Sequence, residues 1–299
     1  MTAAREYQFT QRDFDFLRRL SNERTGIVVT DDKFDMFYSR LARRVRALGL
    51  TSFADYCDYL KHPANDDELT ELVNALTTNL TSFFRENHHF EYLADKALPE
   101  FLQRNRQMRR LRIWSAGCST GEEPYSLAMV LAEQNQPSHG WDVEVLASDI
   151  DSNVLAHAQA GIYPLTRIEG LSQARLTTFF QKGRGRQQGK VRVRDVLRRP
   201  IRFRLINLMD RFAVEQQDVI FCRNVIIYFD KQTKRRLLDK FANALVDGGY
   251  LFVGHSESLH QVTDRFQLIG RIVSSPAHAV FLWPAKTRWT AILSRARSS

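Results

Sequence analysis

The chain has 299 residues and a net charge of +9, with 43% hydrophobic and 26% charged residues, which is typical of a soluble globular protein with one large domain or two smaller ones. A membrane helix is not expected, because no apolar run approaches about 18 residues. A signal peptide is not expected either, because the charged N-terminus lacks the apolar centre of one. The three cysteines form no C-x-x-C pair, which argues against a zinc site or a disulfide framework and predicts a cytoplasmic location.

Residues 1–85 predict a small all-helical domain. Thr10 and Asp13 form a capping-box pattern, and apolar residues follow at helical spacing as far as Gly26. Shorter amphipathic stretches lie at 52–60 and 66–78. Before these stretches, a helix is expected from 31 to 48, and its polar face carries Arg40, Arg43, Arg44 and Arg46.

After a further helix near residues 87–104, apolar strand-like runs alternate with helices. The alternation predicts an α/β fold: a mostly parallel, Rossmann-like sheet with helices on both faces, which binds ligands at the carboxyl ends of its strands. The expected strands are 111–116, 143–149, 201–206, 218–222 and 250–254, and the expected helices are 122–134, 152–160 and 231–246. Two last runs, 266–273 and 278–283, predict a hairpin at one edge of the sheet.

One segment, residues 162–200, interrupts the alternation. Val191 and Val193 alternate there with Arg192 and Arg194, which predicts a small antiparallel β-subdomain inserted before the third core strand. Residues 166–212 hold 13 Lys and Arg against 3 Asp and Glu, which indicates either a solvated face or a docking surface for an acidic partner. We therefore expect a helical domain over 1–85, a sheet domain over 86–285 and a loosely held tail over 286–299.

The turn Gly117-Cys118-Ser119-Thr120-Gly121 has two interpretations. It matches the G-x-S-x-G elbow of serine hydrolases, and Ser119, Asp149 and His255 stand in the chain order of a triad. However, the turn follows the first strand of the sheet, and Glu122 and Glu123 come directly after it. Two ionised carboxylates at this point would oppose the oxyanion that such an elbow stabilises.

The second interpretation is the floor of a cofactor pocket. A helix N-terminus attracts phosphate, but Glu122 and Glu123 would repel a pyrophosphate. The pocket therefore suits a nucleoside that lacks phosphates and carries positive charge, as S-adenosylmethionine does. Asp149 ends the second strand, where an acid accepts hydrogen bonds from ribose hydroxyls; a helix N-cap is the alternative role for Asp149, although Asp151 or Ser152 also fits that role.

In its motifs and their order, the chain resembles the chemotaxis receptor methyltransferases of the CheR type. The matching stretches occur in the family's order across nearly the whole chain: N-L-T-S-F-F-R-E (79–86), W-S-A-G-C-S-T-G-E-E-P-Y-S (114–126), A-S-D-I-D (147–151), N-L (207–208), F-C-R-N-V-I-I-Y-F-D (221–230) and G-H-S-E-S (254–258). Together these stretches are specific, although any one of them alone would not be.

The resemblance implies a protein-glutamate O-methyltransferase that moves the methyl group of S-adenosylmethionine to glutamates on cytoplasmic helices of transmembrane chemoreceptors. Some members also hold an acidic and aromatic peptide of the receptor's C-terminal tail on the β-subdomain, and the Gly183–Gly185 stretch resembles their turn. The implied cofactor contacts are Asn79, Thr81, Arg85, Glu123, Asp149, Asn207, Leu208, Arg223 and Asn224. The basic face of the 31–48 helix would meet the receptor helices.

The acceptor carboxylate is already ionised at neutral pH, because a glutamate pKa is about 4.3. No general base is then needed, and the sequence offers Arg85 to pair with the carboxylate and Tyr228 to orient it. We expect no metal, no membrane insertion, no nucleic-acid partner and a monomer. The main alternative is a nucleic-acid methyltransferase, which the basic excess suggests, but Arg223-Asn224-Val225-Ile226 stands where such enzymes carry an N-P-P-Y-like motif.

Overall fold

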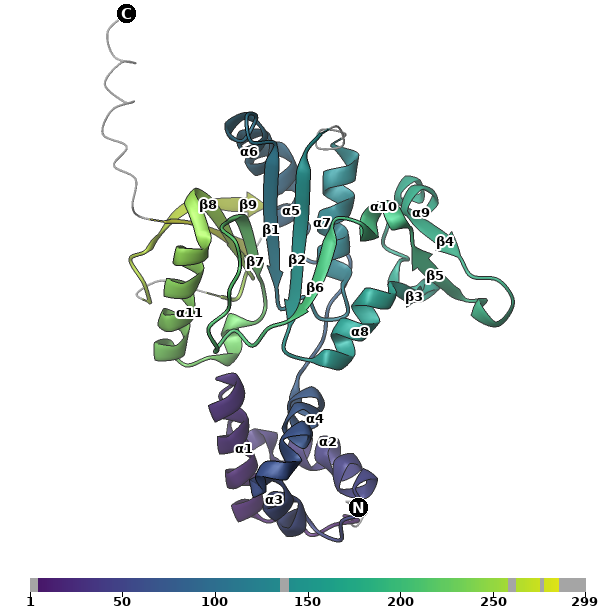
Figure 1. Cartoon of the computed structure of the whole chain (residues 1–299), viewed down its shortest axis with the longest axis vertical. Coiled ribbons are helices and arrows are strands. Elements are labelled where there is room, and N and C mark those ends of the chain that lie inside the picture. The colour runs from purple at the N-terminus through teal and green to yellow at the C-terminus, as the bar shows by residue number, and fades with distance from the viewer. Residues whose placement is uncertain (1–4, 135–139, 258–261, 275–276, 285–299) are drawn as a thin grey trace, which may run out of the picture.

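The computed structural model describes residues 5–134, 140–257, 262–274 and 277–284. It consists of a helical N-terminal domain and an α/β domain, as Figure 1 shows, with a small β-subdomain projecting from the latter. This is the predicted fold class. The division at residue 85 and the domain end at residue 285 stay predictions, and the tail 286–299 lies outside the described residues. None of the described helices is long and apolar enough to cross a membrane.

The N-terminal domain packs its helices around a common apolar core. The predicted capping box is confirmed, because Thr10 and Asp13 bond reciprocally, and Gly26 ends the first helix with a φ of 73° in the left-handed region that glycine favours. Phe14, Leu17 and other large apolar side chains are fully buried between the helices. The helices are α1 (Gln11–Thr25), α2 (Phe34–Ala47), α3 (Phe53–Lys61) and α4 (Asp66–Leu76).

The basic face of α2 is used largely within the chain. Arg40 donates to the carbonyl oxygens of Leu76 and Thr77, at 2.6 and 2.8 Å. Arg44 binds Glu68 with two hydrogen bonds, and Arg46 pairs with Glu6. Arg40 and Arg44 are thus engaged within the chain, whereas Arg46 stays exposed, and the meeting of this face with receptor helices stays a prediction. Arg43 is exposed.

The α/β domain contains a sheet whose strand order is β6-β2-β1-β7-β8-β10-β9. Strands β6, β2, β1, β7 and β8 run parallel to one another. Strands β9 and β10 form the predicted antiparallel hairpin at the edge. The predicted Rossmann-like sheet is thus confirmed. The strands are β1 (Arg110–Ala116), β2 (Asp142–Asp149), β6 (Ile201–Leu205), β7 (Gln217–Cys222), β8 (Leu245–Val253), β9 (Phe266–Ser274) and β10 (Ala277–Pro284).

Alternate side chains of β1 enter two different cores, one on each face of the sheet. Leu111 and Ile113 pack against helices on one face, whereas Trp114 and Ala116 pack against α11 (Lys231–Ala244) on the other. The first face is covered by α5 (His88–Tyr92), a π-helical turn (Leu93–Ala97), α6 (Leu98–Arg104), α7 (Glu122–Glu133) and α8 (Ser152–Ala160).

The insert forms the predicted antiparallel sheet, in the order β3-β5-β4. Val191 and Val193 are buried and Arg192 is exposed, as their alternation predicted. Two arginines fasten the insert to α7: Arg167 pairs with Glu122 at 3.2 Å and Arg175 pairs with Glu133 at 2.7 Å. Its elements are β3 (Ile162–Pro164), α9 (Gln173–Phe179), β4 (Phe180–Lys182), β5 (Lys190–Val193) and α10 (Asp195–Arg198).

The helical domain lies beneath the α/β domain in Figure 1, against the edge where the parallel strands end. The backbone N–H of Val28 donates to the carbonyl of Tyr228 at 2.9 Å. On the other side of the junction, Thr77 donates to Asp151 at 2.6 Å. These contacts join the two domains around the carboxyl edge of the sheet.

Candidate active site

The glycine turn after β1 is the floor of a pocket. Gly117 has a φ of 97°, and a Cβ there would lie 2.5 Å from the side chain of Val225, so only glycine fits. Ser119 also has a positive φ, of 49°. Its backbone N–H donates to Asp149 at 2.8 Å, and its hydroxyl donates to the carbonyl of Asn79 at 3.1 Å.

These contacts argue against the hydrolase triad. The Ser119 hydroxyl bonds a backbone carbonyl, and Asp149 holds the backbone of Ser119. His255 binds elsewhere, with its Nδ1 2.8 Å from an oxygen of Glu86. A nucleophile needs a base within hydrogen-bond reach that is itself oriented by a third group, and these three residues do not make that chain.

Asp149 lines the pocket and does not cap a helix. Asp151 caps α8 by accepting from the backbone N–H groups of Asn153 and Val154. Asp149 is free of that role and accepts from the backbone N–H groups of Ser119 and Asp151, at 2.8 and 3.0 Å. Burial raises the pKa of its carboxyl, because desolvation disfavours the ionised form.

The two glutamates that follow the turn point in different directions. Glu123 lines the pocket. It accepts from the Ser115 hydroxyl at 2.7 Å and pairs with Arg223 at 3.2 Å, and burial raises its pKa. Glu122 is fully buried and pairs with Arg167 of the insert. Only Glu123, the predicted contact, therefore lies at the pocket, because a helix turns its neighbouring side chains by about 100°.

Arg223, directly after β7, is the centre of a buried charge network. Its side chain is only 2% exposed and lies 3.2 Å from Glu123 and 3.4 Å from Glu86. It also donates to the backbone carbonyl of Arg85. Arg223 and its two glutamates are therefore paired, which fixes their positions before any ligand arrives.

Glu86 was not assigned a role from the sequence, although it ends the matched stretch 79–86. Its carboxylate contacts Arg223, Asn224 and His255, which follow the ends of β7 and β8. Despite the cost of burial, these hydrogen bonds and charges lower the pKa of Glu86 to about 2. Glu257 was not assigned a role either: its carboxylate accepts from the backbone N–H groups of Asn224 and Gly254, and burial raises its pKa. Membership of a matched stretch was the only available signal.

One group of three residues with metal-ligating side chains occurs in the described part of the chain: Glu86, His88 and His89. Their ligand atoms lie within 4.8 Å of one another. The guanidinium of Arg223 is 3.4 Å from the Glu86 carboxylate, and this positive charge would repel a cation at that carboxylate. The absence of a metal stays a prediction.

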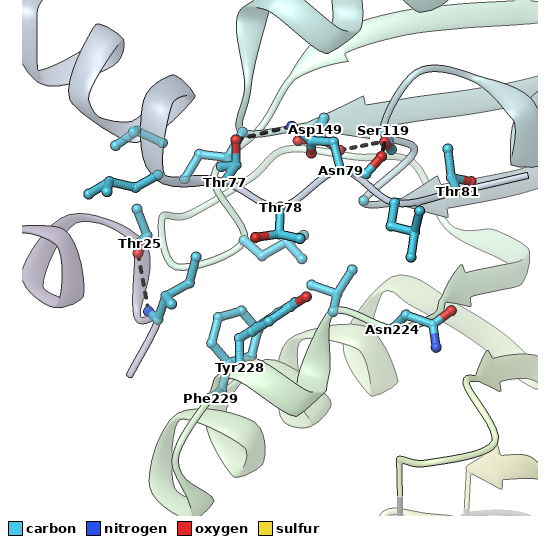
Figure 2. A pocket seen from close by; sticks show the side chains of 18 of the residues that line it. Thr25, Thr77, Thr78, Asn79, Thr81, Ser119, Asp149, Asn224, Tyr228 and Phe229 are labelled. Carbon is cyan, nitrogen blue, oxygen red and sulfur yellow. Dashed lines mark hydrogen bonds between the residues drawn. The ribbon is translucent and has the colours of Figure 1, made fainter. Parts of the chain in front are cut away.

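The predicted site residues, which lie between positions 79 and 228 of the chain, all line one cavity of about 210 Å³. Figure 2 shows that Tyr228 lies on the wall opposite Thr78 and Asn79, with Asp149 and Ser119 beyond them. Residues of the helical domain, including Val28, complete the cavity. The predicted residues that meet there are Asn79, Thr81, Arg85, Glu123, Asp149, Asn207, Leu208, Arg223, Asn224 and Tyr228.

Comparison with known proteins identifies the family. The model described as "CheR methyltransferase, all-alpha domain" matches residues 12–77, and that described as "CheR methyltransferase, SAM binding domain" matches residues 79–273. The chain belongs to the CheR methyltransferase family. It is 46% identical to chemotaxis protein methyltransferase 2 of Pseudomonas aeruginosa, over 91% of this chain and 95% of the relative. It is 45% identical to the chemotaxis protein methyltransferase of Salmonella typhimurium, over 89% and 92%.

As a CheR methyltransferase, the chain is an enzyme that uses S-adenosylmethionine, and its pocket fits that cofactor. Glu123 and Asp149 are buried carboxylates whose pKa values burial raises. Such groups bind favourably to a ligand that brings positive charge and hydroxyl donors. The comparisons favour neither the hydrolase nor the nucleic-acid methyltransferase alternative.

Proposed function

We propose that this CheR methyltransferase acts in the cytoplasm and methylates glutamate side chains on the cytoplasmic helices of chemoreceptors, forming glutamyl methyl esters. Its relatives are chemotaxis protein methyltransferases, which supports a role in chemotaxis. The residues that line the pocket support a carboxylate as the acceptor of the methyl group. Among the described residues, that lining includes no histidine, and a carboxylate is an acceptor that needs no base at neutral pH.

In this proposal Glu123 binds the ammonium of the cofactor, Asp149 binds its ribose hydroxyls, and Asn207 and Leu208 contact the adenine end. When bound, S-adenosylmethionine supplies an electrophilic methyl group on a sulfonium. Arg223 holds Glu123 in place at 3.2 Å, and Glu86 balances its charge from the other side. The remaining predicted contacts are Asn79, Thr81, Arg85 and Asn224.

Arg85 and Tyr228 are the residues that we propose hold the acceptor. Arg85 donates to the carbonyl of Leu80 at 2.8 Å and has further N–H groups with which to bind a carboxylate. Tyr228 lies on the opposite wall, and its backbone is fixed by the hydrogen bond from Val28. Together they would remove water from the carboxylate and hold it in line for transfer.

The experiment is methyl transfer from isotopically labelled cofactor into receptor-bearing membranes, followed by treatment with alkali. Glutamyl esters release volatile methanol, whereas methylated amines and nucleobases keep the label. Label that resists alkali would contradict the proposal. We also expect kcat to stay nearly flat from about pH 6.5 to 8.5, because no group of near-neutral pKa takes a proton. A steep single-proton dependence of the chemical step would contradict the mechanism.

We further propose that the β-subdomain tethers an acidic, aromatic receptor tail. Strand β4 is an edge strand of the small sheet, and an extended peptide can add to such an edge. The turn 183–189 is closely built, since a Cβ on Gly183 would lie 2.0 Å from the carbonyl oxygen of Gln187. Tethering raises the local enzyme concentration among clustered receptors.

Shortening residues 183–189 to a tight turn should abolish binding of a tail peptide and spare binding of S-adenosylhomocysteine. Calorimetry with each ligand measures both effects. If the shortened protein bound the tail peptide normally, the basic insert would be only a solvated face.

A further inference from the structure

The segment 79–85 lies between α4 and α5 along the wall of the cavity, and we call it the arm. Asn79 and Thr81 of the arm line the cavity (Figure 2), and so does Arg85. The arm forms neither a helix nor a strand, so it lacks the repeated backbone hydrogen bonds that make such elements rigid. Contacts from other segments must therefore position these three side chains.

The inserted β-subdomain holds the arm by two phenylalanines. The ring of Phe83 packs edge-on against Tyr163 of β3 and Phe180 of β4, with ring centroids 5.2 and 5.7 Å apart. The guanidinium of Arg175, in α9, lies 3.8 Å from the ring centroid of Phe84. Edge-to-face ring pairs and cations over rings are both attractive arrangements. Both phenylalanines are therefore anchored in the insert.

Arg167 of the insert joins the arm to the start of α7. Its Nη1 donates to the carbonyl oxygen of Thr81 at 3.0 Å, and its Nη2 lies 3.2 Å from a carboxylate oxygen of Glu122. Glu122 is fully buried, and Arg167 is the cation that pairs with it among the described residues. A planar guanidinium binds two partners in fixed directions, whereas an ammonium is a point charge on a flexible stem. One side chain of the insert therefore sets the distance between the arm and α7.

The backbone on both sides of Arg85 has an unfavourable conformation. Phe84 and Glu86 have φ values of 51° and 54°, in the left-handed region that residues other than glycine rarely adopt. Such conformations persist only where surrounding contacts hold them. Glu86 is held by Arg223, whereas Phe84 is held by the insert at its ring and by Ser126 of α7 at its backbone N–H. The position of Arg85 thus depends in part on the insert.

We propose that the insert has a function beyond any binding of a receptor tail: it positions the arm, with Arg167 as the central positioning residue. The inference rests on the proposed function, because that function gives Arg85 the task of holding the acceptor. Within the described part of the chain, no hydrogen bond, ion pair or ring contact joins the turn 183–189 to the arm. The exposed cations of that turn are therefore expected to act independently of the pocket.

The test removes the Arg167 bridge without leaving a buried charge. Arg167→Met alone would leave Glu122 unpaired, which destabilises a fold. Arg167→Met combined with Glu122→Gln removes both charges, and the glutamine can still accept from the Thr120 hydroxyl. In the full chain, the urea midpoint of this double variant should stay close to that of the wild type. Its kcat should fall roughly tenfold, because misplacing a positioned group by about 1 Å can cost about a hundredfold.

The matched control is Arg198→Met. Arg198 ties the insert to α8 by donating to the carbonyl of Gln159 at 3.1 Å, and it pairs with Asp195. None of its hydrogen bonds or ion pairs within the described residues reaches the arm. Loss of this arginine should leave kcat unchanged, so a general loosening of the insert would not imitate the effect of losing Arg167.

Hydrogen exchange separates positioning from a merely structural role. Read by mass spectrometry, the amides of the arm should exchange faster in the double variant and at the wild-type rate in Arg198→Met. Affinity for S-adenosylhomocysteine should fall a few-fold in the double variant, because Asn79 and Thr81 move with the arm. A second variant, Arg175→Met, removes the cation over Phe84 and leaves the partly exposed Glu133 in contact with water. It should also speed exchange of the arm and lower kcat a few-fold.

The outcomes distinguish this inference from the proposed function. If the wild-type enzyme forms no alkali-labile esters on receptors, the proposed function is overturned, whereas faster exchange of the arm and weaker cofactor binding in the double variant would still support positioning by Arg167. A folded double variant with wild-type kcat and wild-type exchange of the arm would overturn the inference. A fall in kcat without faster exchange of the arm would overturn it as well. If the double variant does not fold, Arg175→Met decides, and wild-type kcat and exchange in that variant would overturn the inference.

Discussion

The cofactor pocket and the inserted β-subdomain use charged side chains in opposite ways. At the pocket, the side chains of Glu86, Glu123 and Arg223 are at most 12% exposed, and Arg223 pairs with both glutamates. In the insert, five cations on the β4–β5 hairpin are exposed, and no ion pair to them occurs within the described part of the chain: Lys182, Arg184, Arg186, Lys190 and Arg192. Buried pairs fix a geometry, whereas unpaired surface cations remain available to a partner.

The largest expected effect follows from removing the central charge of the pocket. Arg223→Met leaves Glu86 and Glu123 without their shared cation, and breaking a buried pair costs about 3–5 kcal/mol. The free energy of unfolding, measured by urea denaturation, should fall by about that amount. Arg186→Met, in the exposed hairpin, should change it by less than about 0.5 kcal/mol. Equal losses in the free energy of unfolding of the two variants would contradict the distinction between buried and exposed charges.

The next effect concerns cofactor affinity. Asp149→Asn removes the charge that we propose accepts the ribose hydroxyls, and hydrogen bonds to charged groups contribute about 1.5–3 kcal/mol. Calorimetry with S-adenosylhomocysteine should show about a 10- to 100-fold weaker affinity. Asp195→Asn, at an exposed position of the insert, is the control and should bind normally. Unchanged affinity in a folded Asp149→Asn protein would remove Asp149 from the site.

A smaller effect follows from pH. Burial raises the pKa values of Glu123 and Asp149, so both carboxylates gain protons at a higher pH than exposed ones. Protonation removes their attraction for the cofactor, and affinity for S-adenosylhomocysteine should fall as the pH is lowered through these raised pKa values. Below the pKa of one such group the loss approaches about tenfold per pH unit. Affinity that stays constant down to the lowest pH at which the protein remains folded would show that neither carboxylate binds the ligand as an anion.

The features that could be predicted from the sequence are those that local patterns determine. The alternation of strands and helices, the hairpin at the sheet edge and the small β-subdomain follow from local periodicity, which short segments carry by themselves. The pocket residues follow from motifs at strand ends, because the carboxyl ends of parallel strands meet at one edge. The insert's Val–Arg alternation likewise predicted its buried and exposed faces.

Contacts between distant segments could not be predicted in this way. Glu86 meets Asn224 and His255, which are 138 and 169 residues away in the chain, and no local pattern specifies such a pairing. Arg44 looked like a surface charge of α2 until the packing of α4 placed Glu68 beside it. Glu122 and Glu123 were equivalent in sequence, and only the orientation of α7 separates the one in the pocket from the one under the insert.

The smallest expected effect concerns the exposed cations of the β4–β5 hairpin. Arg184→Gln with Arg186→Gln removes two cations of the hairpin, and exposed pairs contribute about 0.2–1 kcal/mol each. Binding of an acidic tail peptide should weaken a few-fold at low salt, and the difference should vanish at about 0.5 M salt, where charges are screened within a few ångströms. Arg106→Gln, an exposed arginine before β1, is the matched control. Because neither arginine touches the buried network, unfolding and cofactor affinity should stay unchanged. A change in either would mean that the insert and the pocket are energetically coupled, and a salt-independent loss of tail binding would mean that the two arginines shape the turn and do not attract the peptide by charge.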